Sequence, residues 1–96
     1  MDWLIRSFQC KKTGRLFRRE RVKEFASIAT VALRRLVALD GAQSLSDLLI
    51  PPSNRLEPLA GGRKGQHSIR IDDQYRICFT WRDGNAENVE ITKHYR

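Results

Sequence analysis

Hydrophobic residues change their spacing twice along this chain. Residues 3–8 alternate weakly between apolar and polar and predict a first strand. The next segment favours a short helix that Thr13 caps and that continues to Arg19 or further. From about residue 25 to 40 the apolar positions lie three and four apart, which is typical of a helix with one buried side. The helical stripe consists of Ile28, Val31, Ala32, Leu36 and Leu39.

Prolines separate this helical part from a second part with strand periodicity. Residues 44–47 resemble a capped turn of helix, and Pro51 and Pro52 prevent its continuation. Beyond them the apolar period becomes two, which predicts strands at residues 55–59, 66–71, 75–81 and 88–95. Pro58 lacks a backbone donor and places the first of these strands at a sheet edge. Helices followed by a run of strands favour an α+β fold whose antiparallel sheet carries the helices on one side. The length suits one domain, residues 1–96.

Alternation within the strands also predicts which residues share a face. Tyr75, Ile77, Phe79 and Trp81 form one face of their strand, and Arg76, Cys78, Thr80 and Arg82 form the other. In the last strand Val89 and Ile91 are on the apolar face, and Glu90, Thr92 and His94 are on the polar face. A tight turn centred on Asn85 would bring the two apolar faces together, with Phe79 opposite Ile91 and Arg76 opposite His94.

The polar face of the predicted sheet gathers positive charge. It collects Arg70, Arg76, Arg82 and His94, and like charges without partners would destabilise a sheet. Such a face suits phosphate binding, because arginine grips a phosphoryl group with two donors and histidine exchanges protons near neutral pH. The alternative is an ordinary solvated outer face. His67 is on the opposite, apolar side of its strand, and we interpret it as a structural residue.

Composition strengthens the case for an anionic partner. The 96 residues include 18 Lys and Arg against 11 Asp and Glu, a formal net charge of +7. The candidates are RNA, DNA or an acidic protein, and the simpler alternative is that the charge only aids solubility. Seven basic residues and one acidic residue occupy positions 11–23, a segment that could contact nucleic acid or an acidic protein, or could be a solvated helix face.

Cysteine and histidine usage argues against metal or disulfide chemistry. Cys10 and Cys78 make no disulfide framework, and they form no zinc motif with His67 and His94. We therefore expect reduced thiols, no metal and no cofactor. No apolar run approaches the roughly 20 residues of a membrane span, and the first residues do not resemble a secretory leader, so we expect a cytoplasmic protein.

Three short motifs, in this order, resemble the HigB family of bacterial toxins. They are residues 54–59 (NRLEPL), 65–71 (GQHSIRI) and 74–79 (QYRICF), and the opening residues 5–8 (IRSF) match as well. HigB toxins belong to the RelE-like superfamily. The resemblance implies a helical hairpin packed on a twisted, mainly antiparallel sheet of four to five strands.

The same resemblance implies a function. It indicates the toxin of a type II toxin–antitoxin system, an endoribonuclease that cleaves mRNA on the translating ribosome without a metal. Its partner would be a HigA-type antitoxin with a helix-turn-helix domain, and operator DNA would be bound only through that antitoxin. Two other functions stay open: a non-catalytic RNA- or ribosome-binding regulator, and a corepressor that acts with its antitoxin.

The resemblance also supplies candidate site residues. Arg76 matches the strand arginine that relatives use on the scissile phosphate, and Arg63 matches a basic loop residue. Glu57, Arg76 and His94 resemble the Glu/Arg/His set of the YoeB branch, with Tyr95 next to the histidine. Relatives commonly end Asp-Tyr-His, whereas this chain ends Lys-His-Tyr-Arg, and Ala60 stands where some members have lysine.

These matches imply a division of roles. Glu57 is the expected base, His94 the acid, and Arg76 with Arg63 the electrostatic clamp. We expect ribosomal RNA backbone to contact the basic segment together with Arg34 and Arg35. The RNA-binding candidates are Arg63, Arg70, Tyr95, Lys93, Lys11, Lys12, Arg15, Arg18 and Arg19.

Overall fold

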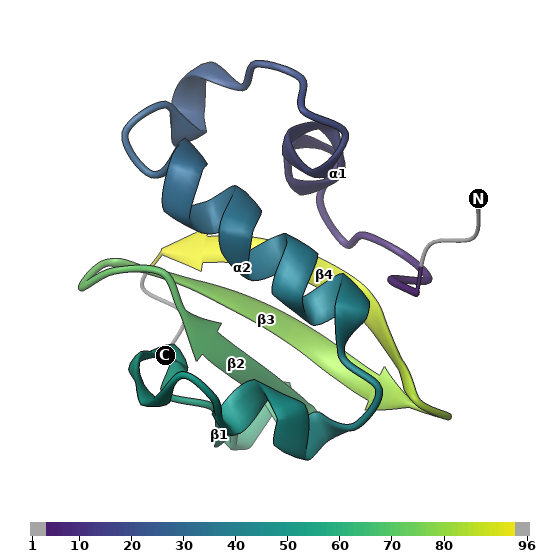
Figure 1. Cartoon of the computed structure of the whole chain (residues 1–96). Helices are drawn as coiled ribbons and strands as arrows, with labels where there is room; N and C mark the ends of the chain where they lie inside the picture. Colours follow the sequence, from purple (N-terminus) through teal and green to yellow (C-terminus); the bar gives the residue numbers. More distant parts are fainter. Residues whose placement is uncertain (1–3, 94–96) are drawn as a thin grey trace.

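The computed structural model describes residues 4–93 as two helices on one face of a four-stranded antiparallel sheet (Figure 1). The helices are α1 (Lys11–Phe17) and α2 (Ala29–Gly41). The strands are β1 (Glu57–Pro58), β2 (Gln66–Arg70), β3 (Tyr75–Arg82) and β4 (Asn85–Lys93), in the spatial order β1-β2-β3-β4. Short 3₁₀ helices connect them at η1 (Lys23–Phe25), η2 (Leu45–Leu49), η3 (Pro52–Asn54) and η4 (Gly61–Arg63). The predicted α+β class is confirmed.

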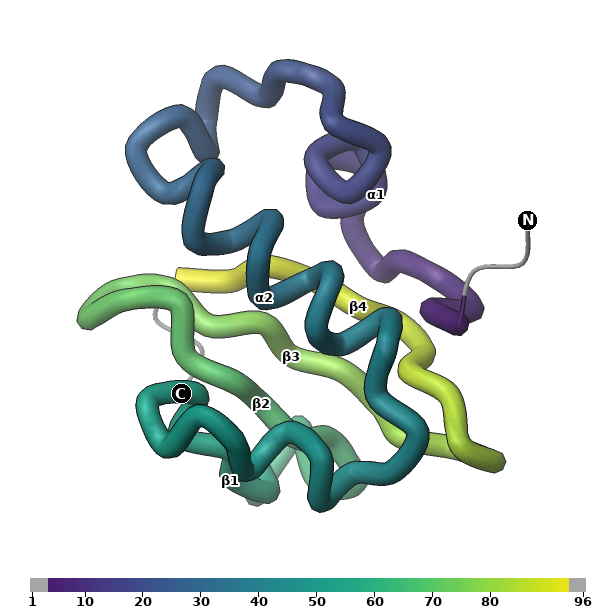
Figure 2. The backbone as a smooth tube through the Cα atoms, in the orientation of Figure 1, coloured from purple at the N-terminus to yellow at the C-terminus, as the bar shows by residue number. Residues whose placement is uncertain are grey.

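The core is the layer between α2 and the sheet, and the tube view in Figure 2 shows α2 lying over the strands, in roughly the same direction as β3. The buried side of α2 supplies Ala32, Leu36 and Leu39. The sheet supplies Ile69, Ile77, Phe79, Val89 and Ile91, all buried. These residues are the ones whose spacing predicted the buried helix side and the apolar strand faces.

The beginning of the chain differs from its prediction. Within residues 4–8 the structure has two isolated parallel bridges to β4, Ile5 with Ala86 and Phe8 with Val89, in place of a continuous strand. The cap predicted at Thr13 is wrong, because α1 begins at Lys11 and Thr13 lies inside it. The Thr13 hydroxyl is fully buried and accepts the backbone N–H of Ile91 at 3.0 Å, so it joins α1 to the sheet.

Two local predictions of the middle segment are confirmed. In η2 the carboxylate of Asp47 accepts the backbone N–H groups of Gln43 and Ser44, at 2.9 and 3.2 Å, as in a capping box. Pro58 lies in β1, a two-residue strand at the sheet edge. The long helix begins later than predicted, at Ala29, and η1 precedes it.

The β3–β4 hairpin keeps the predicted faces in a different register. Asp83 and Gly84 form a two-residue loop with φ of 53° and 79°, and this loop pairs Arg82 with Asn85. That register, if unbroken, would set Ile77 against a glutamate. An irregularity at Asn88, with φ of 53°, adds one residue to β4 and restores the match of the apolar faces.

The bulge changes the predicted neighbour of Arg76. Ile77 pairs with Ile91, and Arg76 pairs with Thr92. The prediction of Arg76 opposite His94 is therefore wrong, and the difference is two residues. His94 itself lies outside the described residues.

Candidate functional site

One row of side chains crosses the sheet on the face away from the helices. Glu57 pairs with Ser68, Ser68 with Cys78, and Cys78 with Glu90, so the row includes one residue from each strand. Directly opposed residues project to the same face of a sheet. Ser68 and Cys78 are fully buried at the centre of this outer row, and the two glutamates end it.

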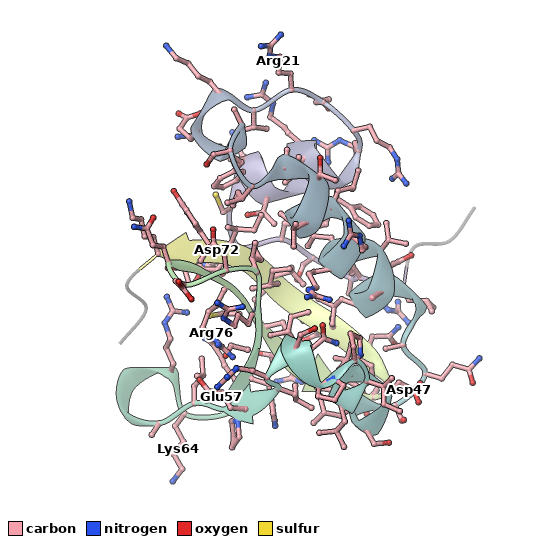
Figure 3. All side chains as sticks on the ribbon, turned by 60° about the vertical axis from the view of Figure 1, so that its left-hand side comes forward. Arg21, Asp47, Glu57, Lys64, Asp72 and Arg76 are labelled. Atoms are coloured by element: carbon pink, nitrogen blue, oxygen red, sulfur yellow. The ribbon has the colours of Figure 1, made fainter. Side chains whose placement is uncertain are left out.

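Arg76 lies beside the row, and neighbouring residues hold its guanidinium. Its Nε donates to the Ser68 hydroxyl at 2.7 Å, and its Nη2 donates to the carbonyl of Arg55 at 2.6 Å. The same Nη2 is 3.6 Å from a carboxylate oxygen of Glu57. Figure 3 shows Arg76 and Glu57 together on this side of the molecule. Only 9% of Arg76 is exposed, so its guanidinium is positioned before any ligand arrives.

The Arg55 carbonyl reaches Arg76 because of an unusual backbone conformation. Arg55 follows η3 with φ of 47° and ψ of 53°, in the left-handed region. A residue with a Cβ adopts this region at an energetic cost, which the surrounding structure must offset. Sequence reasoning missed both Arg55 and Ser68 as partners of Arg76.

Arg63 reaches the row from the other side. Its Nη1 donates to Glu90 at 2.9 Å and to the side-chain oxygen of Gln66 at 3.0 Å. It belongs to η4, which Gly61 opens with φ of 64°. Two oppositely charged pairs, Arg76 with Glu57 and Arg63 with Glu90, therefore lie along one row.

The Cys78 thiol lies among these four charges. Burial raises the pKa of Cys78, and the charge of Arg63 offsets part of that rise. The carboxylates of Glu90 and Glu57 act in the same direction as burial, whereas Arg76 opposes it. A fully buried thiol with a raised pKa is a poor nucleophile, so Cys78 acts here as a packing residue.

The outer face differs from the predicted cluster of unpaired arginines. Arg70 pairs with Asp73, Arg76 with Glu57, and Arg82 with Glu87 at 3.7 Å. Strand alternation already placed Glu90 on the polar face, but pairing depends on register and on the reach of long side chains.

The structure brings together some of the predicted site residues and separates others. Glu57, Arg63 and Arg76 share the outer face, and Arg70 is the cross-strand partner of Arg76. Lys93 lies instead on the side of Tyr75, with Nζ 5.6 Å from that ring centroid. His94 and Tyr95, the other expected members, lie outside the described residues.

His67 has the structural position predicted for it. It is half-buried on the apolar side of β2, and its ring stacks against Phe79 with centroids 6.3 Å apart. Its buried Nδ1 has no hydrogen-bond partner within residues 4–93, and the ring is directed away from the outer row.

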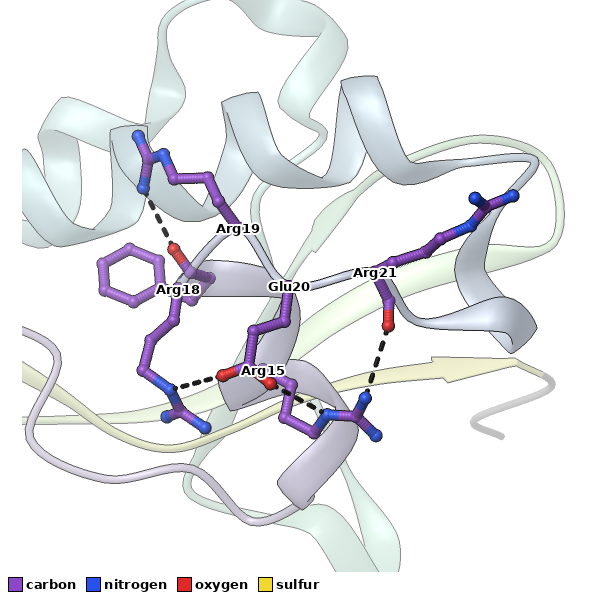
Figure 4. A network of polar contacts seen from close by, with 6 residues as sticks. Arg15, Arg18, Arg19, Glu20 and Arg21 are labelled. Carbon is purple, nitrogen blue, oxygen red and sulfur yellow. Dashed lines mark hydrogen bonds and ion pairs between the residues drawn. The ribbon is translucent and has the colours of Figure 1, made fainter.

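The basic segment forms a separate surface on the helical layer. We call it the α1 basic surface, and its exposed members are Lys11, Lys12, Arg15, Arg18, Arg19, Arg21 and Lys23. Figure 4 shows Glu20 between Arg15 and Arg18, each 3.2 Å away. Hydrogen bonds from these two arginines lower the pKa of Glu20.

Arg35 departs from the prediction that grouped it with this surface. Its Nε donates to the carbonyl of Arg70 at 3.2 Å, and its Nη2 is 3.4 Å from the Ser53 hydroxyl. These contacts tie α2 to the end of β2. Arg34, the neighbouring candidate, is exposed.

Residues 4–93 contain no cluster of three or more His, Cys, Asp or Glu side chains that could hold a metal ion. No helix in the same part of the chain is long and apolar enough to cross a membrane.

Comparisons with known proteins agree with this architecture. Residues 1–94 match a family described as "RelE-like toxin of type II toxin-antitoxin system HigB". Over 92 residues the chain is 42% identical to Toxin HigB-1 of Vibrio cholerae serotype O1, a match that covers 96% of this chain and 90% of that protein. It is 28% identical over 69 residues to an uncharacterised protein of Haemophilus influenzae, covering 72% of this chain and 68% of the relative. Among solved structures, that of a YafQ mutant from E. coli has a TM-score of 0.62 at 13% identity, covering 94% and 93% of the two chains, a similarity of fold.

Proposed function

Because the chain belongs to the HigB-like family of RelE-like toxins of type II toxin–antitoxin systems, we propose that it is a metal-independent endoribonuclease that cleaves mRNA on the ribosome. Members of RelE-like toxin families are generally endoribonucleases. The observation that carries the proposal is the outer row, where a nearly buried arginine is fixed next to a glutamate. A fixed cation can stabilise charge on a phosphate and a nearby proton acceptor can serve as a base, which are two of the functions that phosphodiester cleavage uses.

The proposed reaction is attack by the RNA's own 2′-hydroxyl on the adjacent phosphorus. Glu57 takes the 2′ proton while the bond from O2′ to phosphorus forms. The bond from phosphorus to O5′ breaks, and His94 gives its proton to the leaving oxygen. The products are a 2′,3′-cyclic phosphate and a 5′-hydroxyl. The side chain of Glu57 is 46% exposed and so accessible to a substrate. Arg76 and Arg63 stabilise the charge that develops on the phosphate, and Tyr95 stacks on a base or orients the phosphate.

Partners follow from the family and from the charge. Type II toxins are neutralised by an antitoxin, and we assign a HigA-type helix-turn-helix protein, through which operator DNA would be bound. The α1 basic surface would contact ribosomal RNA backbone, and Arg70 and Lys93 would add contacts to RNA. The binding should weaken steeply as salt rises. Ribosome association independent of salt would contradict this role. The competing use of the same surface is docking an acidic antitoxin segment. The protein would act in the cytoplasm, where its ribosomal target is found.

The test is inducible expression with mapping of the 5′ ends of cleaved transcripts. Wild-type protein should arrest growth and leave breaks in coding regions, whereas Arg76→Ala and His94→Ala should each relieve the arrest. Arg82→Ala is the matched control, because Arg82 is an exposed arginine of the same strand outside the row. Circular dichroism must show that all three variants fold.

Two results would reject the assignment. Wild-type toxicity in both variants would remove Arg76 and His94 from the reaction. Cleavage of an analogue without the 2′-hydroxyl at the scissile position would exclude the proposed nucleophile.

One observation supports a non-catalytic alternative. Arg63, Arg70, Arg76 and Arg82 all have carboxylate partners within the described part of the chain, so the outer face is less electropositive than its sequence suggests. A regulator that binds RNA or the ribosome through the α1 basic surface alone would slow growth without new transcript ends.

A further inference from the structure

Glu90 is the acidic residue of the outer row that no catalytic role uses. It ends the row on β4, and its carboxylate receives the Arg63 guanidinium at 2.9 Å. Both side chains are largely shielded, at 23% exposed for Glu90 and 28% for Arg63. The partners come from elements 27 residues apart in sequence, so the tertiary fold creates this contact.

The pair sets the charge that an incoming phosphate would meet. Arg63 and Arg76 supply two positive charges to the row, and Glu57 and Glu90 supply two negative ones. A phosphate that approaches Arg63 therefore competes with a carboxylate that already occupies it. Arg63 also donates to Gln66, so the guanidinium is held over the row while its charge is balanced.

We infer that Glu90 is a positioning residue that keeps Arg63 in place and competes with the RNA backbone for it. The inference rests on the proposed function, because it takes the row as the site where a phosphate binds. An incoming phosphate must displace the Glu90 carboxylate from Arg63 or share Arg63 with it, and this cost lowers the affinity for nucleic acid. Binding therefore depends more on contacts made elsewhere, such as those of the α1 basic surface.

The expected signature is a change in the salt dependence of binding. The logarithm of affinity for single strands falls against the logarithm of salt concentration with a slope of about −0.7 for each phosphate neutralised. In the wild type the Arg63 charge is already balanced, so its contact with phosphate contributes little to this slope. Glu90→Gln keeps an oxygen acceptor for Arg63 but removes the negative charge. It should bind about tenfold tighter at low salt, a gain of about 1.4 kcal/mol, with a slope steeper by about 0.7.

The experiment is fluorescence anisotropy with the purified protein and a short oligothymidine single strand, which offers backbone phosphates but has no 2′-hydroxyl to react. Glu87→Gln is the matched control. It removes the same charge from the same strand, but its partner Arg82 is more exposed and 3.7 Å away. For Glu87→Gln, the affinity should stay within twofold of the wild type, and the slope should equal the wild-type slope within error. Glu90→Asp, which keeps the charge, should retain the wild-type slope.

A second cycle tests whether Glu90 acts through Arg63. When Arg63→Gln is already present, adding Glu90→Gln frees no cation, so the slope should not change. If Glu90→Gln fails to fold, Glu90→Ala is a second variant that removes the same charge.

The outcomes separate this inference from the proposed function. The role of Glu90 is overturned, whatever the cleavage assay shows, if Glu90→Gln leaves the slope unchanged. It is also overturned if Glu87→Gln steepens the slope equally, or if Glu90→Gln steepens it equally in the Arg63→Gln background. A steeper slope specific to Glu90 and dependent on Arg63 supports the role even if transcripts are not cleaved. If the wild type and every variant fail to bind the strand, the row is not a phosphate site and the inference is wrong.

Discussion

Ser68 provides the most direct test of how Arg76 is held. The serine is fully buried on β2, and its hydroxyl accepts the Arg76 Nε–H at 2.7 Å. Ser68→Ala removes that acceptor at a position that is fully buried from solvent. The nearly buried guanidinium then keeps a charged N–H without this partner.

The magnitude follows from the charge and the burial. Hydrogen bonds to charged groups contribute about 1.5–3 kcal/mol, and the loss is largest where solvent cannot replace the partner. We expect Ser68→Ala to lower the free energy of unfolding by about 2 kcal/mol. In a chain of this size each kcal/mol shifts Tm by about 4–8 °C, so Tm should fall by about 8–16 °C.

Urea denaturation measures the effect, with the midpoint shifting at an unchanged slope m. Ser27→Ala is the matched control, because Ser27 is exposed and should change stability by less than about 0.5 kcal/mol. If the enzyme proposal holds, Ser68→Ala should also lower kcat more than it raises KM, since the misplaced group is Arg76. A midpoint equal to that of the Ser27 variant would refute the view that Ser68 positions the arginine.

Two further predictions concern the hairpin loop and η2. Gly84→Ala should destabilise the protein by about 1–2 kcal/mol because φ at Gly84 is 79°, whereas Gly62→Ala, with open space at Cβ and no positive φ, should be nearly neutral in the same denaturation assay. The backbone N–H groups of Gln43 and Ser44 hold the pKa of Asp47 below its ordinary value, so its stabilising contribution is complete above about pH 4 and is lost as the pH falls through the lowered pKa. Asp47→Asn should abolish this part of the fall in the unfolding midpoint at acidic pH. If the variant and the wild type have the same pH profile, the role of the carboxylate is contradicted.

Local sequence pattern determined the long helix α2, the strands of the sheet and the buried side of each. Three- and four-residue spacing marked the buried side of α2, and alternation separated Ile77 and Phe79 from Arg76 and Cys78. These features depend on the geometry of single helices and strands, which repeats at fixed intervals and is therefore visible in one segment alone. The motif resemblance then supplied the family, and the similarity of residues 1–94 confirmed it.

Tertiary structure decided which side chains meet. The bulge at Asn88 selected the neighbours of Arg76, and nothing in the strand pattern indicated that one extra residue would be inserted there. Arg63 meets Glu90 because a loop and the far strand fold onto one face, and Thr13 meets β4 because α1 packs against it. Long and buried polar side chains find their partners through register and packing, which join residues distant in sequence. The sequence therefore identified the charged residues, whereas the tertiary structure decided which of them form ion pairs along the outer row.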